Sequence, residues 1–102
     1  MLTWRTAANV LLAAFGHLML GHTGSAARDG GEAVAILTGF GDSWGLVHAQ
    51  ALLGAIAQAE GRLEEAAQAF EHAADESATL GFLGQAALHR ASLARVQHRA
   101  DD

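Results

Sequence analysis

Apolar residues recur along this chain at intervals of three and four, the spacing that places them on one face of a helix. The clearest example lies between residues 43 and 60, where the apolar positions are Leu46, Ala49, Leu52, Leu53, Ile56 and Ala57. Asp42 or Ser43 precedes this run, and either side-chain oxygen can accept a free amide of the first helical turn. Gly61 follows it and suits the left-handed residue that ends many helices. The pattern therefore predicts a helix over residues 43–60.

A second apolar face follows directly after Gly61 and consists of Leu63, Ala66, Ala67, Phe70, Ala73 and Ala74. The other side of this segment is a solvated polar face made of Arg62, Glu64, Glu65, Gln68, Glu71, Asp75 and Glu76. The same patterning along the whole chain predicts an all-α fold of about five helices, roughly at residues 3–20, 24–38, 43–60, 63–79 and 82–99. No stretch alternates with a period of two, so no strand is expected. The links are short, so consecutive helices must run antiparallel.

The sequence also repeats itself at an offset of forty residues. This offset aligns Trp4 with Trp44, Gly21 with Gly61, and Gly41 with Gly81. The chain then reads as one domain over residues 1–102, built from about two and a half units at 1–40, 41–80 and 81–102. Each complete unit is a helix–turn–helix pair, and such pairs stack into a solenoid.

The second unit resembles a tetratricopeptide repeat. The family pattern is carried here by Leu53-Gly54, Ala57, Gly61, Ala66, Phe70 and Ala73, all in register. The unit departs from the family in its length of about forty residues instead of thirty-four, and in having Ala78 where the family has a terminal proline. The resemblance implies an α-α superhelix of antiparallel helix pairs.

The segment Gly41-Asp42-Ser43-Trp44-Gly45-Leu46 is similar to the linker of long-repeat helical arrays in large actinobacterial regulators, such as LuxR-type ATPase regulators and antibiotic-pathway activators. Six arginines, 24 alanines and no lysine fit a high-GC genome. The resemblance implies a cytoplasmic module of a bacterial transcriptional regulator, either a piece of a longer protein or a small relative that has the array alone.

In tetratricopeptide arrays, the first helices of successive units line a concave groove for a peptide or partner helix. By register, the resemblance assigns this groove to Leu11, Phe15, Leu18, Met19, His48, Gln58, Arg95, His98 and Arg99, together with Ala8, Ala51, Ala55, Ala59, Leu88 and Ala91. The groove would be apolar at one end and basic at the other, and would suit an extended ligand with an apolar anchor and an acidic group. Leu11 and Phe15 replace the lysine and asparagine of the chaperone-binding carboxylate clamp, which disfavours chaperone tails.

The first helix is apolar on nearly all sides, and a helix of that kind is normally buried. The apolar surface of this helix that its neighbours in the fold leave uncovered is expected to pack against a preceding repeat or against a second copy of the chain. A homodimer through this helix is therefore the simplest expectation. The predicted function is thus a protein-interaction or self-association module. The alternative is a sensor domain that binds a small anionic or amphipathic ligand in the groove, held by Arg95 and Arg99.

Composition narrows these choices further. The formal net charge of -5 argues against a nucleic-acid partner. The absence of cysteine excludes disulfides, thiol nucleophiles and cysteine-based metal sites. The apolar run at residues 10–20 is shorter than the about 20 residues of a spanning helix, so no membrane is expected. Trp4, Asn9 and His17 fit a secretory signal poorly, and the run belongs to the repeat.

The sequence offers no convincing catalytic or metal site. His72 and Glu76 lie four residues apart on one helix face, but no third ligand is in register, so the six histidines are interpreted as solvent-facing or half-buried. No nucleophile elbow or phosphate loop is present, and Gly30-Gly31 is expected to weaken or kink its helix. We therefore expect no enzyme activity, no cofactor and no metal.

Overall fold

The computed structural model describes the backbone of residues 4–101 and the side chains of residues 5–101, and over this range the chain forms five α-helices and no strand. They are α1 (Trp4–Met19), α2 (Thr23–Phe40), α3 (Ser43–Ala59), α4 (Leu63–Thr79) and α5 (Leu83–Asp101). The predicted all-α class is confirmed, and most predicted helix ends lie within two residues of those observed. The first residue of the helix predicted over 3–20 lies outside the described residues.

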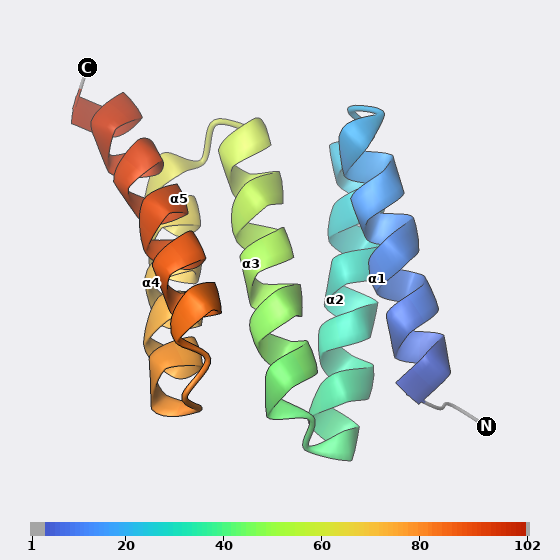
Figure 1. Ribbon diagram of the computed structural model, residues 1–102. Coiled ribbons are helices and arrows are strands. Elements are labelled where there is room, and N and C mark those ends of the chain that lie inside the picture. The colour runs from blue at the N-terminus through green and yellow to red at the C-terminus, as the bar shows by residue number, and fades with distance from the viewer. Residues whose placement is uncertain (1–3, 102) are drawn as a thin grey trace.

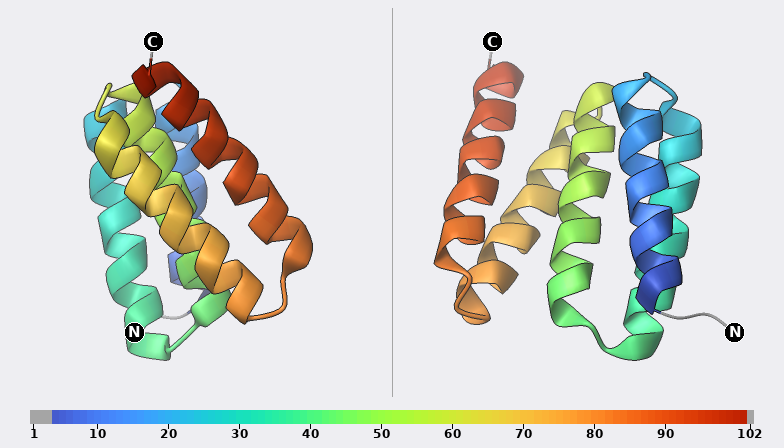
Figure 2. Two further views of the ribbon diagram at one scale, coloured as in Figure 1. Left: turned by 90° about the vertical axis from the view of Figure 1, so that its left-hand side faces the viewer. Right: turned by 45° about the vertical axis from the view of Figure 1, so that its right-hand side comes forward.

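The helices form two layers (Figure 1). Helices α1, α3 and α5 make the front layer in that view, and α2 and α4 lie behind them. Each helix packs antiparallel against the next in the chain, so the three front helices all run in the same direction. The result is a slab with extents of 47 × 33 × 17 Å. Figure 2 shows the slab from the side, with α5 lying against α4 and standing apart from α3.

Four turns of identical construction join the helices. In the α3–α4 turn, the amide of Gly61 donates to the carbonyl of Gln58 and the amide of Arg62 donates to that of Ala57, the arrangement that closes a helix through a left-handed residue. The glycines at the four turns all have positive φ: Gly21 (80°), Gly41 (66°), Gly61 (80°) and Gly81 (84°). They recur every twenty residues, so the forty-residue period contains two helix–turn units.

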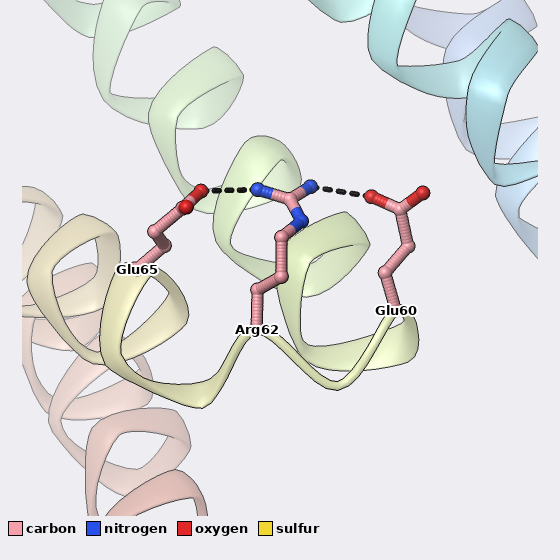
Figure 3. Close-up of polar contacts among 3 residues, drawn as sticks. All are labelled: Glu60, Arg62 and Glu65. Carbon is pink, nitrogen blue, oxygen red and sulfur yellow. Dashed lines mark hydrogen bonds and ion pairs between the residues drawn. The ribbon is translucent and has the colours of Figure 1, made fainter.

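The beginning of α3 is fixed by a side-chain cap. The Asp42 carboxylate accepts the Gly45 amide at 2.9 Å, which selects Asp42 over Ser43 as the capping residue. At the beginning of α4, Arg62 donates to the carboxylates of Glu60 and Glu65 across the α3–α4 turn (Figure 3). These contacts lie on an exposed surface, where ion pairs contribute little to stability.

The core is built mainly from alanine, with a few larger side chains between the alanines. Ala49, Ala57, Ala66 and Ala73, which belong to the two predicted apolar faces, are all 0–3% exposed. Leu37, Ile56, Phe70 and Val96 fill the space that remains. Short side chains allow close helix axes, which is why an alanine-rich chain folds into a thin slab.

Helix α2 continues through Gly30 and Gly31 from Thr23 to Phe40, so neither glycine ends it, and the expected weakening of the helix stays a prediction. Gly30 is buried, and a Cβ atom at this position would lie 2.9 Å from Cδ2 of Leu53 on α3. Because Gly30 has no side chain, α2 and α3 can pack closely at this point. Gly31 faces open space and has no such role.

Candidate functional site

The front layer contains an apolar hollow of about 400 Å³, which we call the central hollow. It is lined from α1 by Leu11, Leu12 and Phe15, from α3 by His48, Ala51, Leu52 and Ala55, from α4 by Phe70, and from α5 by Leu88, His89 and Ser92. Leu12, Phe15 and Leu88 at its rim are 71%, 54% and 63% exposed, which is high for side chains of this size. Large exposed apolar residues that gather on one face are typical of an interaction site.

The hollow exists because the front helices pack against the back layer more closely than against one another. Helix α1 packs on α2 and touches α3 only slightly, and α5 packs on α4. Ala51 and Ala55 present short side chains on the wall that α3 contributes, so they leave the space between the front helices open. The ring of Phe70, from the back layer, reaches the hollow from behind.

Two of the three polar side chains that line the central hollow are imidazoles. His48 is half-buried and His89 is only 5% exposed, and the buried Nε2 atom of each has no hydrogen-bond partner among the described residues. Trp44 lies edge-on against the His48 ring with a centroid distance of 4.2 Å. Burial lowers the pKa of His48, an effect partly opposed by the negative charge of Asp42. Burial also lowers the pKa of His89, and His48 adds to that shift.

A second hollow of about 440 Å³, which we call the basic hollow, is lined by Gln58 of α3 and by Ala94, Arg95, His98 and Arg99 of α5. Arg95 connects the two hollows, because its Nη2 atom donates to Oγ of Ser92 at 3.0 Å and Ser92 lines the central hollow. Neither hollow has a carboxylate among the described residues that line it. Arg62 differs from Arg95, because its charge is already paired with Glu60 and Glu65. The same contact with Arg62 lowers the pKa of Glu60.

The structure brings most of the sequence-predicted groove residues to these two hollows. Leu11, Phe15 and His48 line the central hollow, and Gln58, Arg95, His98 and Arg99 line the basic hollow. Leu18 packs instead against a core cluster that contains Ala14, Leu52 and Ile56. Met19 is 70% exposed on α1 and lines neither hollow.

The sequence interpretation missed His89 and described the histidines as solvent-facing or half-buried, which is wrong for this residue. A signal for its burial was present, because Ala86, His89 and Val96 fall on one helical face together with the half-buried Leu93. The sequence interpretation also omitted Leu12, whose exposed side chain forms part of the rim.

Within the described residues, no group of three or more histidine, aspartate or glutamate side chains is placed to hold a metal ion. His72 and Glu76 are both exposed on α4 and lie apart from the two hollows. None of the five described helices is long and apolar enough to cross a membrane.

No family model matches this chain, and neither a curated protein nor a solved structure gives a match. The relationship to tetratricopeptide repeats and to actinobacterial regulators therefore stays a prediction, which rests on the residues of the second unit and the linker before it.

Proposed function

We propose that this chain is a protein-interaction module that holds a partner segment across the central and basic hollows. The segment places apolar side chains against Leu12, Phe15 and Leu88, and a carboxylate beside Arg95 and Arg99. The observation that carries the proposal is the junction of an apolar hollow with a basic one through Ser92 and Arg95, without a carboxylate among the described lining residues.

The two hollows contribute to binding in different ways. Covering apolar surface yields about 25 cal/mol per Å², so affinity comes mainly from the rim of the central hollow. The arginines fix the direction of the segment and speed its association, which is the usual contribution of charge complementarity. Because both arginines are exposed, this part of the interaction weakens as salt is added.

Self-association is another form of the same function. Leu12, Phe15 and Met19 follow one another at three- and four-residue spacing along α1 and are all exposed. A second copy of the chain that covered this strip would also bury the rim of the central hollow. Sedimentation at tens of micromolar distinguishes the two cases: a dimer that Leu12→Glu dissociates would make the second copy the occupant, and a monomer would leave the hollows for another protein.

Selection of 16-residue peptides from a display library on the purified chain tests the proposal. We expect the selected peptides to share apolar residues at helical spacing and an acidic residue toward one end. By calorimetry, Leu88→Glu should weaken their binding more than tenfold, since it places a charge on the apolar rim. Arg95→Glu should weaken it severalfold and reduce its salt dependence.

Two matched controls lie on the same helix. Leu83 is 71% exposed and Arg90 is exposed, and neither lines a hollow. Leu83→Glu and Arg90→Glu should leave peptide binding unchanged. Selected peptides without a shared pattern, or an equal loss in the Leu88 and Leu83 variants, would contradict the proposal.

A small-ligand sensor is the second candidate, and the size of the central hollow favours it. Its volume of about 400 Å³ falls within the range of roughly 300–1,000 Å³ that is common for small-molecule pockets. Decanoate, which combines an apolar chain with a carboxylate, is a suitable probe. A rise in melting temperature with decanoate, lost in both Leu88→Glu and Arg95→Glu, together with a failure to select any peptide, would favour the sensor.

A further inference from the structure

We propose that His48 and His89 form a polar anchor in the central hollow that receives one uncharged hydrogen-bonding group, a hydroxyl or a carboxamide, from a Ser, Thr, Asn or Gln side chain of the bound segment. This inference rests on the proposed function, because it names what the occupant of the central hollow must carry. It adds a third element of recognition to the apolar rim and the basic hollow.

The first argument is that two buried nitrogens have no partner. Buried polar atoms are almost always hydrogen-bonded, and one left unpaired costs free energy. The Nε2 atoms of His48 and His89 both lack a partner among the described residues, although they come from different helices and both residues line the same hollow. A guest that supplies the missing hydrogen bonds removes this cost, and a purely apolar guest does not.

The second argument concerns access. Helix α3 and helix α5 approach each other only loosely here, and the side chains between them on α3 are alanines. An imidazole turns about its χ2 bond within a broad energy well. The anchor requires such a rotation of each ring, because both Nε2 atoms are buried in the structure.

The third argument concerns the charge of the guest group. A neutral imidazole has one N–H donor and one acceptor nitrogen. A hydroxyl both donates and accepts, so it can pair with both rings whenever at least one Nε2 atom carries a proton, and a carboxamide, with two N–H donors, can pair with any combination of tautomers. The surroundings favour an uncharged group: α1 contributes Leu11, Leu12 and Phe15, α4 contributes Phe70, and α5 contributes Ser92. Asp42 is the acidic group whose charge reaches His48, and a negative charge there disfavours a carboxylate beside that ring.

Nuclear magnetic resonance of the full chain with ¹⁵N-labelled histidine tests the anchor directly, because long-range ¹H–¹⁵N correlations report each Nε2 atom. The probes are benzyl alcohol and toluene, which differ by one hydroxyl, at pH 7.5. We expect benzyl alcohol to shift the Nε2 resonances of His48 and His89, and to bind about fivefold more tightly than toluene, the equivalent of one net hydrogen bond. Benzamide should behave like benzyl alcohol.

Variants check that the preference comes from this pair. His89→Phe and His48→Phe should each bind the alcohol and toluene with nearly equal affinity, and His72→Phe, on exposed α4 surface, should keep the preference. If one of the first two fails to fold, the other carries the comparison. The resonance shifts in the unaltered chain need no variant.

The outcomes separate this inference from the proposed function. If both probes shift the methyl resonances of Leu11, Leu12 and Leu88 equally and leave both Nε2 resonances unmoved, the anchor is refuted and the binding hollow stands. If neither probe moves any of these resonances, the hollow is not a binding site and the proposed function falls with the anchor. If zinc chloride alone shifts the two Nε2 resonances and benzyl alcohol does not, the pair is half of a metal site and the anchor is again refuted.

Discussion

Gly54 of α3 lies directly against the ring of Phe70 of α4. A Cβ atom at Gly54 would lie 3.2 Å from Cε1 of Phe70 and 3.1 Å from Cβ of Ala69, so the backbone of α3 packs on the aromatic ring. Phe70 is itself 4% exposed and reaches the central hollow from the back layer. This contact therefore joins the two layers and also supports the candidate site.

Replacing Gly54 with leucine should destabilise the protein. The new side chain has no space beside Phe70 and Ala69, and overpacking of this kind typically costs about 1–3 kcal/mol. Urea unfolding followed by circular dichroism measures the difference.

Gly31→Ala is the matched control, because Gly31 also lies within a helix but faces open space. Alanine is the better helix former by about 1 kcal/mol, so this variant should be more stable than the unaltered chain. A Gly54→Leu variant as stable as the unaltered chain would show that α3 and α4 do not pack in the way described.

Truncating the other member of the pair, with Phe70→Ala, should cost about 3–5 kcal/mol. That is a large part of the 5–15 kcal/mol that is typical of a domain, so the variant should melt at a much lower temperature. Phe40→Ala is the control, since Phe40 is 51% exposed at the end of α2 and should matter far less. Equal melting temperatures for the two variants would contradict the core assigned here.

The Gly54–Phe70 contact also shows how far the sequence alone could lead. Both positions belong to the pattern that resembles a tetratricopeptide repeat, and the five helices follow from apolar spacing and turn glycines, which are local properties. The central hollow depends instead on how far α5 stands from α3, a distance set by how α4 packs on each of them, and apolar spacing along the sequence does not determine that arrangement. His89 falls on the same helical face as Ala86 and Val96, so its burial could have been predicted from the sequence, but its place in the central hollow could not.

Asp42→Ala should remove the cap of α3 and cost about 1 kcal/mol. The carboxylate accepts the Gly45 amide, which has no partner within its own helix. Asp42→Asn should restore most of the loss, because the amide oxygen can accept the same bond. Asp75→Ala, on the exposed face of α4, should change the free energy of unfolding very little. If Asp42→Asn does not restore the stability lost in Asp42→Ala, the effect comes from the negative charge of Asp42 and not from the capping hydrogen bond.

Stability should fall as the solution is acidified below about pH 6.5, and the two hollow histidines are the reason. Burial lowers the pKa of His48 and of His89 from their ordinary value of 6.5. Above pH 6.5 these imidazoles are neutral in both the folded and the unfolded chain, so they do not lower the free energy of unfolding. Below it the unfolded chain takes up protons that the folded chain resists, and stability declines until the pH reaches the lowered folded pKa values.

Melting temperatures measured between pH 7.5 and pH 5.5 report this decline. The whole range lies above 4.5, the ordinary pKa of a glutamate carboxyl, so protonation of Glu60 in its ion pair with Arg62 does not contribute. His89→Phe should flatten the dependence, because phenylalanine has no proton to gain and fits an apolar wall. His72→Phe should leave the slope as it is, since His72 is exposed on α4. A slope that survives in the double variant His48→Phe with His89→Phe would locate the pH sensitivity elsewhere in the chain, and would mean that the imidazoles are hydrated in the folded protein.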